Sequence, residues 1–181
     1  TLVGVLSADQ MLYINDYRAH ERTFSLITQV VGRSGRGSKQ GRAVIQTLTP
    51  SNEVIRLAAG QDYDSFYIRE IALRRLTGSP PIFDLVALTV SGQDETLVLQ
   101  SCVKLRQALQ GYFRDLDEIK ILGPAPAAVA KINNRYRYRL SISCKINRRI
   151  RDTIAHVVRE AAKNREFRGI HVFADIDPYE S

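Results

Sequence analysis

A glycine- and arginine-rich stretch carries the residue types best suited to chemistry in this sequence. Residues 29–37 are QVVGRSGRG, with Arg33 and Arg36 three positions apart and glycines on either side. Residues three apart lie on one side of a helical turn, so both guanidinium groups can point the same way. Arginine is permanently charged, and its forked donors match phosphate oxygens. The stretch therefore indicates a polyphosphate site, with a solvated surface turn as the alternative.

Gln29 makes the pattern more specific, because the string becomes Q-x-x-G-R-x-x-R. This string resembles the sixth conserved motif of superfamily 2 helicases, which reaches from the second RecA-like lobe to ATP on the first. The resemblance implies catalytic roles for Gln29, Arg33 and Arg36, and it places Gly32 and Gly35 at the nucleotide between the lobes. In phosphoryl transfer, such an arginine stabilises charge on the departing phosphate and is worth roughly 10³–10⁵ in rate.

The neighbouring residues predict the elements that position this motif. Apolar runs predict strands at 2–6 and 41–48, the first buried on both faces, and helical spacing of apolar residues predicts a helix at 21–31. This order is consistent with the tail of a parallel α/β lobe. Asp9 follows the first strand, where polar residues face the ligand crevice of an open sheet. Asp9 is therefore a candidate interlobe residue, with a simple turn residue as the alternative.

Two helices should follow the second strand. Thr49 is expected to cap the first, with Pro50 in its first turn and Gly60 at its end. Residues 78–81 (GSPP) should stop the second and mark a domain boundary. That second helix, at 61–77, is expected to direct five side chains inward: Tyr63, Phe66, Tyr67, Leu73 and Leu76.

After the prolines, the pattern predicts the order β-α-β-β-α-β. This is the split β-α-β of ferredoxin-like folds, with two helices on one face of an antiparallel sheet and the other face open. The fold class is therefore α/β followed by α+β, with divisions at 1–48 (the end of a helicase lobe), 49–81 (a helical connector) and 82–181 (a ferredoxin-like domain). The predicted elements are strands at 83–90, 118–122, 136–146 and 169–175, helices at 95–114 and 148–164, and a turn at 123–126.

The third of these strands is strongly basic. Between positions 131 and 151 lie eight of the chain's 26 lysines and arginines, and no acidic residue. Alternation along a strand puts the arginines on the open face, about 6.5–7 Å apart, which resembles the step between phosphates of a nucleic acid. A net charge of +7 agrees with such a partner, and a solvated strand face is the alternative. The candidate DNA-binding residues are Arg135, Arg137, Arg139, Lys145, Arg148 and Arg149.

Several stretches together resemble one family over essentially the whole chain. They are DYRAHER at 16–22, QVVGRSGRG at 29–37, LGPAP at 122–126, RYR at 135–137 and DIDP at 175–178. The chain resembles the C-terminal part of the PriA family, the primosomal replication-restart DNA helicases of bacteria (primosomal protein N′). The resemblance implies an ATP-dependent 3′–5′ helicase for replication restart and primosome assembly, in which Arg33 and Arg36 contact the γ-phosphate.

The same resemblance implies cofactors, partners and a location. ATP and Mg²⁺ would serve the full-length parent, and zinc would be held by upstream cysteines that this chain lacks. Partners would be forked or branched DNA, single-stranded DNA-binding protein and primosome proteins, in the cytoplasm. The chain begins within an apparent strand and has no phosphate loop, so we expect a fragment that is inactive by itself. The competing hypothesis is a non-catalytic nucleic-acid-binding module.

The sequence also argues against a membrane-spanning protein, a disulfide and a metal site. The sequence contains no run of 18 apolar residues, so no transmembrane helix is expected, and no signal peptide is visible. Cys102 and Cys144 lie far apart on apolar faces, and buried thiols are expected rather than a disulfide or a metal pair. The three histidines show no metal-ligand spacing.

Overall fold

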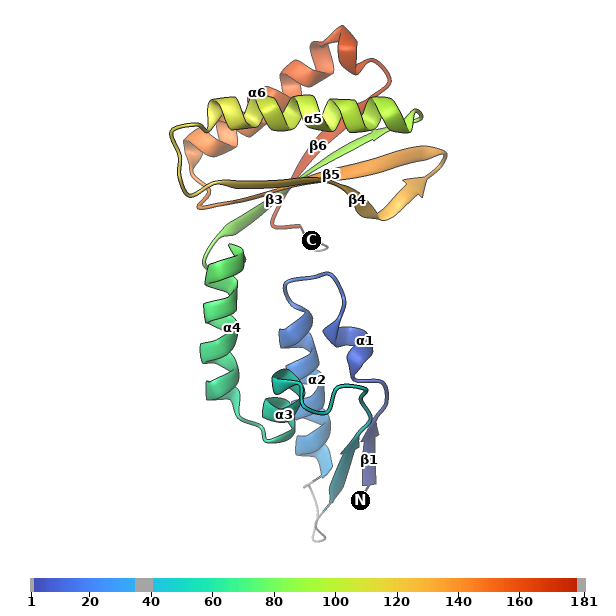
Figure 1. Cartoon of the computed structure of the whole chain (residues 1–181), viewed down its shortest axis with the longest axis vertical. Coiled ribbons are helices and arrows are strands. Elements are labelled where there is room, and N and C mark those ends of the chain that lie inside the picture. The colour runs from blue at the N-terminus through green and yellow to red at the C-terminus, as the bar shows by residue number, and fades with distance from the viewer. Residues whose placement is uncertain (1, 35–40, 179–181) are drawn as a thin grey trace. The chain divides into compact units, whose positions relative to one another are not determined.

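The computed structural model describes residues 2–34 and 41–178. The chain divides into two compact units, Thr1–Leu76 and Thr77–Ser181, and each is described by itself (Figure 1). Gly35 and Arg36 of the arginine motif lie outside the described residues.

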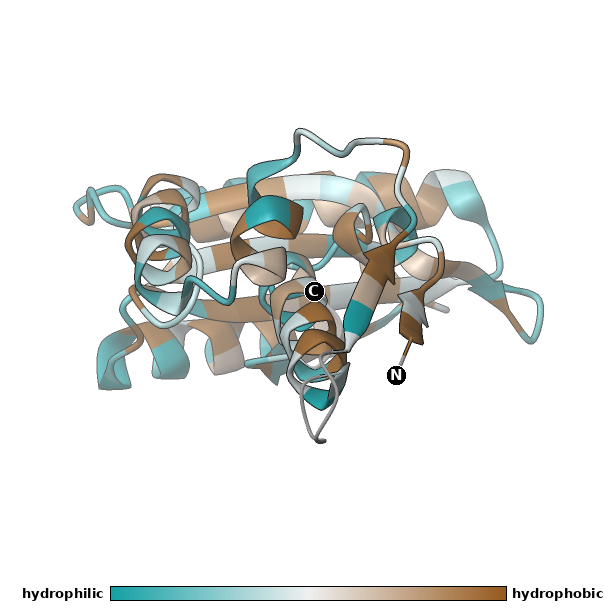
Figure 2. Ribbon diagram, turned by 90° about the horizontal axis from the view of Figure 1, so that it is seen from below, coloured by the Kyte–Doolittle hydropathy of each residue, from teal (hydrophilic) through white to brown (hydrophobic). Residues whose placement is uncertain are grey.

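The first unit contains the predicted strand-helix-strand order. β1 (Leu2–Val5) and β2 (Arg42–Ile45) pair in parallel, with α1 (Asp9–Leu12) and α2 (Ala19–Ser34) between them in the chain. Both strands are largely hydrophobic (Figure 2). The expectation that residues 2–6 are buried on both faces is wrong, since Leu2 and Leu6 are 72% and 80% exposed. Among the described residues, only β2 is hydrogen-bonded to β1, so a two-stranded sheet cannot cover these side chains.

The helices of this unit pack through a small aromatic and aliphatic core. Phe24 of α2 stacks on Phe66 of α4 (Tyr63–Thr77), with ring centroids 4.2 Å apart. Ile27 of α2 is fully buried, and Ala58 of α3 (Glu53–Ala59) is equally enclosed. This packing fixes α2, the helix that ends in the arginine motif, against α3 and α4.

Two expectations for these helices are wrong. α3 is capped by Asn52, whose side chain accepts a hydrogen bond from the Val54 amide, and not by Thr49. The reason is that the Thr49 hydroxyl is bonded to Asp9 instead. In α4 the buried residues are Phe66 and Glu70, because only a narrow stripe of this helix is covered. The other four residues predicted to point inward are exposed: Tyr63, Tyr67, Leu73 and Leu76.

The second unit has the predicted order β-α-β-β-α-β. Its four strands form an antiparallel sheet in the order β4-β5-β3-β6, and the helices cover one face (Figure 1). This is an α+β domain. Its elements are β3 (Asp84–Gly92), α5 (Glu95–Tyr112), β4 (Lys120–Ile132), β5 (Arg135–Cys144), α6 (Arg148–Lys163), η1 (Arg165–Phe167) and β6 (His171–Ile176).

The core of this unit lies between the sheet and the helices. Alternate residues of β3 and β5 face α5 and α6, as period-two patterning requires. At the last turn of α5, Tyr112 is 49% exposed and lies outside this core. The core comprises Val86, Leu88 and Val90 of β3, Leu140, Ile142 and Cys144 of β5, Val98, Cys102, Leu105 and Leu109 of α5, and Ile150, Ile154, Val157 and Ala161 of α6.

β4 is much longer than predicted. Residues 123–126, expected to form a turn, lie inside the strand, which pairs irregularly with β5 between Leu122 and Ala125 and again between Pro126 and Lys131. β4 is an edge strand, and edge strands and bulges tolerate prolines because no ladder donor is needed there. The true turn is Asn133-Asn134, both with positive φ, as a two-residue type I′ hairpin requires.

Candidate functional site

The described part of the arginine motif lies at the C-terminal end of α2. Gln29 and Arg33 are exposed and four residues apart, so they share one face of the helix. Gly32 is also exposed, and a Cβ added there would only make an ordinary contact, 3.5 Å from the side-chain nitrogen Nε2 of Gln61. The described fold therefore does not require a glycine at this position. The face presents an amide and a guanidinium to solvent, donors that suit a polyphosphate.

The opposite end of α2 is tied to α4 by charged residues. Nδ1 of His20 lies 3.1 Å from the buried carboxylate of Glu70. Arg74 donates to Glu70 at 3.1 Å and to Glu21 at 2.8 Å. Burial opposes ionisation of Glu70, but the hydrogen bonds from His20 and Arg74 outweigh it and hold the pKa of Glu70 below its usual value. The network holds the start of α2 against α4. It therefore fixes the direction of the helix that carries Arg33 at its other end.

Asp9 joins the segments that follow the two parallel strands. Its carboxylate accepts hydrogen bonds from the Leu48 amide and from the hydroxyls of Thr47 and Thr49, each at 2.8 Å. The Leu48 amide and then the Thr49 hydroxyl lower the pKa of Asp9. These bonds fit the alternative that Asp9 is a turn residue with a structural role. A place for Asp9 in a nucleotide crevice stays a prediction.

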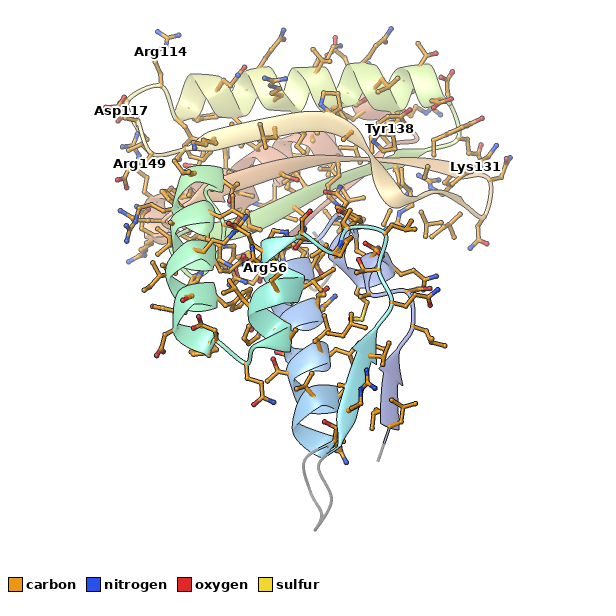
Figure 3. The ribbon with its side chains drawn as sticks, turned by 60° about the horizontal axis from the view of Figure 1, so that its bottom comes forward. Arg56, Arg114, Asp117, Lys131, Tyr138 and Arg149 are labelled. Carbon is orange, nitrogen blue, oxygen red and sulfur yellow. The ribbon has the colours of Figure 1, made fainter. Side chains whose placement is uncertain are left out.

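The six candidate DNA-binding residues are split between the two ends of the second unit. Arg135, Arg137 and Arg139 lie on the hairpin side of β5, while Lys145, Arg148 and Arg149 follow its other end. The eight residue steps from 137 to 145 span about 26 Å at the rise of a strand. Figure 3 shows this separation, with Lys131 and Tyr138 at one end of the unit and Arg149, Arg114 and Asp117 at the other.

At the second end, acidic residues from outside the basic run pair with these cations. Arg149 donates to both carboxylate oxygens of Asp115, at 2.9 and 3.0 Å, and this contact lowers the pKa of Asp115. Lys145 lies 3.0 Å from Glu118. Arg148, almost fully exposed, lies 3.6 Å from Asp152 on the next turn. The basic run contains no acidic residue along the chain, but at this end of the folded unit acidic residues outside the run pair with its cations.

At the hairpin end, the arginines have different roles. Arg135 donates to the backbone carbonyls of Ser91 and Gly169, at 3.0 and 3.2 Å, and so braces β3 against the approach to β6. Arg137 and Arg139 are half-buried on the face away from the helices. Among the described residues, no carboxylate forms an ion pair with Arg137. This end is the better candidate for binding an anion.

The described residues offer no metal site. No three His, Cys, Asp or Glu side chains in residues 2–34 and 41–178 come together in a way that could hold an ion. Cys102 and Cys144 are free and buried, as predicted, and burial raises the pKa of their thiols to about 12 and about 11. The zinc implied by the resemblance was expected on upstream cysteines, so its site stays a prediction about the parent protein.

The predicted sites also lie outside two larger hollows. One, of about 690 Å³, runs between α5, α6 and η1, with Leu105, Val157 and Phe167 in its lining. The other, of about 630 Å³, lies between α3 and the start of α4, beside Arg56 (Figure 3). None of the described helices is long and apolar enough to cross a membrane.

Sequence reasoning missed two side chains on the face away from the helices. His171 and Phe173 of β6 are exposed and, by register, share that face with Arg137 and Arg139. The predicted strand at 169–175 already contained both residues. Alternation along that strand could have placed them together, but the neighbour of β6 in the sheet could not be known.

Comparison with known proteins agrees with this organisation. The model of the primosomal protein N C-terminal domain family matches residues 75–179. The chain is 37% identical to the replication restart protein PriA of Bacillus subtilis, over 99% of the chain and 22% of that protein. It is 40% identical to PriA of Synechocystis, over 78% of the chain and 17% of that protein. It is 33% identical to PriA of Chlamydia muridarum, over 98% of the chain and 23% of that protein.

The chain thus spans about a fifth of the length of the curated relatives it matches. The family model covers almost all of the second unit, including the four-stranded sheet and both of its helices. By this match, the chain belongs to the primosomal protein N (PriA) C-terminal domain family.

Proposed function

We propose that this chain is the part of an ATP-dependent 3′–5′ DNA helicase, acting in replication restart and primosome assembly, that supplies arginine fingers and a DNA-binding domain. The observation that carries the proposal is the position of Gln29 and Arg33. They lie together on an exposed face at the end of α2, which connects two parallel strands. The relatives are named replication restart proteins, which supports the same role.

In this proposal, residues 1–48 are the end of the second RecA-like lobe and residues 49–81 a helical connector. The parallel β1–β2 pair with α2 between them supports the lobe. Arg33 and Arg36 contact the γ-phosphate, and Gln29 couples nucleotide state to lobe closure. Asp9, Gly32 and Gly35 line the crevice between the lobes, where ATP and Mg²⁺ would bind in the full-length parent.

Residues 82–181 form the ferredoxin-like DNA-binding domain. Arg137, at the hairpin end of β5, supports this part of the proposal best, because ion pairs engage Lys145, Arg148 and Arg149 at the other end. The partners are forked or branched DNA, single-stranded DNA-binding protein and primosome proteins, in the cytoplasm. Zinc belongs to upstream cysteines of the parent, and no residue of this chain is assigned to it.

The proposal is tested in the full-length parent. Arg33→Ala and Arg36→Ala should each reduce DNA-stimulated ATP turnover by roughly 10³–10⁵ while DNA affinity stays nearly unchanged. The matched control is Arg75→Ala, which removes an exposed arginine from α4. Normal turnover by both variants would refute the catalytic assignment.

The second candidate is a non-catalytic nucleic-acid-binding module. It is favoured by the exposure of Arg33 and by the lack of a phosphate loop in the sequence. Under this function, Arg33→Ala would lower DNA affinity and make its salt dependence shallower. Measuring turnover and affinity on the same variants separates the two functions.

A further inference from the structure

Two rows of side chains cross the face of the four-stranded sheet that lies opposite α5 and α6. Thr89 of β3 pairs with Arg139 on one side and with Phe173 on the other. Residues paired directly across an antiparallel sheet project from the same face. Because each strand is about 4.8 Å from the next, Arg139 and Phe173 are anchored about 10 Å apart.

The next row repeats this arrangement. Ser91 of β3 pairs with Arg137 of β5 and with His171 of β6. Successive residues on one face of a strand are about 6.5–7 Å apart, so the two rows are neighbours. We call these six residues the platform: Thr89, Ser91, Arg137, Arg139, His171 and Phe173.

The platform lies away from the core. Leu88, Val90 and Leu140 alternate with platform residues along β3 and β5, and they are buried beneath the helices. Phe173 is 46% exposed, although large aromatic side chains are usually covered. In the middle of the platform, Thr89 is buried (2% exposed) and Ser91 is partly exposed. Arginines border the platform on the β5 side, and the rings of His171 and Phe173 border it on the β6 side.

Neighbouring residues limit the platform. At the far end of the same face, the Ser143 hydroxyl bonds to the Gly78 carbonyl, so the segment after α4 occupies that end. Asp175, two residues beyond Phe173 on β6, adds a negative charge on that side and disfavours phosphate there. Arg135 fixes the other end through the carbonyls of Ser91 and Gly169. The sugar-phosphate backbone of a bound nucleic-acid strand would therefore lie over β5, and the bases of that strand would turn toward β6.

This arrangement suits an unpaired nucleotide. Every base has a flat face that stacks on an aromatic ring without regard to sequence, and arginine binds the phosphates beside it. In a duplex the bases are stacked inside the helix and cannot reach a ring that lies on a flat sheet. By analogy of fold alone, four-stranded β-α-β-β-α-β sheets with aromatic residues on the open face bind single strands in this way.

We propose that the platform binds single-stranded DNA, with a base stacked on Phe173 and an adjoining phosphate bound by Arg137. The proposal rests on the DNA-binding role proposed above and names the form of DNA that this domain takes. His171 provides a second, smaller ring for the neighbouring base.

The test measures binding of the 181-residue chain to three labelled probes by fluorescence anisotropy. The probes are a short oligothymidylate, an abasic strand of the same length and a blunt duplex. Phe173→Ala should weaken binding to the oligothymidylate by roughly 5- to 150-fold and leave binding to the abasic strand nearly unchanged. Phe173→Tyr, which keeps the ring, should restore affinity. The matched control is Tyr112→Ala, since Tyr112 is 49% exposed but lies on α5.

The arginines should act through phosphate instead. Arg137→Gln should weaken binding to both single-stranded probes and reduce the dependence of log K on log salt by roughly 0.7. Unchanged oligothymidylate binding by Phe173→Ala would refute the stacking proposal while leaving the DNA-binding function standing. An equal loss for the duplex would also refute it, because the face would then be a duplex site. If the unaltered chain binds none of the probes, the proposed DNA-binding function fails as well.

Discussion

Gly78 occupies a position that only glycine suits, and replacing it should destabilise the second unit. Its φ is +73°, and a Cβ built there would lie 2.6 Å from the Ser143 hydroxyl and 3.5 Å from the Ser143 Cβ. Ser143 is buried, and its hydroxyl donates to the Gly78 carbonyl. Gly78→Ala therefore combines backbone strain with the displacement of a buried hydrogen-bond donor.

The magnitude follows from these two effects. A left-handed backbone conformation costs a residue with a Cβ about 1–2 kcal/mol. Loss of the Ser143 hydrogen bond adds about 1 kcal/mol. The free energy of unfolding should fall by about 2–3 kcal/mol, which lowers the midpoint of a unit this size by about 8–24 °C.

Differential scanning calorimetry of the whole chain measures the change. The matched control is Gly111→Ala in α5, where a Cβ would meet nothing within 4 Å and helix propensity favours alanine. In the double variant Gly78→Ala/Ser143→Ala, the obstructing oxygen is absent, so the double variant should be less destabilised than the sum of the single changes. A Gly78→Ala midpoint equal to that of the unaltered chain, or strictly additive effects, would refute the reasoning.

Two further predictions concern buried ionisable groups. Because the pKa of Glu70 is lowered by folding, its ionisation stabilises the folded state above the unfolded pKa, and this contribution is lost as the pH falls through the folded pKa. Urea unfolding at a series of pH values should show that loss, and Glu70→Gln should remove it; an unchanged pH profile in the variant would contradict the network. Burial raises the pKa of Cys102 to about 12, so a thiol reagent at pH 8 should label Cys102 only after unfolding. If mass spectrometry detects labelled Cys102 in the native chain, the packing of α5 against the sheet does not enclose this thiol.

The order of elements was predictable from the sequence because it depends on local spacing. Apolar residues at helical intervals identified α2, α5 and α6, and alternation described β5. The same local patterns placed Leu140 and Ile142 in the core and Arg137 and Arg139 on the opposite face. The cap of α3 was not predictable in this way, because the Thr49 hydroxyl is taken by Asp9, forty positions away.

The sequence alone therefore determined which residues could bind a phosphate, and the motif with Gln29 and Arg33 required no tertiary information. Only the tertiary structure decided which cations are paired and which aromatic residue lies beside them. Asp115 neutralises Arg149 from another element, and Phe173 lies in one row with Arg139 because β3 separates β5 from β6. The physical reason is that helix and strand periodicities act within a few residues, whereas ion pairs and sheet neighbours depend on strand order and register, which link distant parts of the chain.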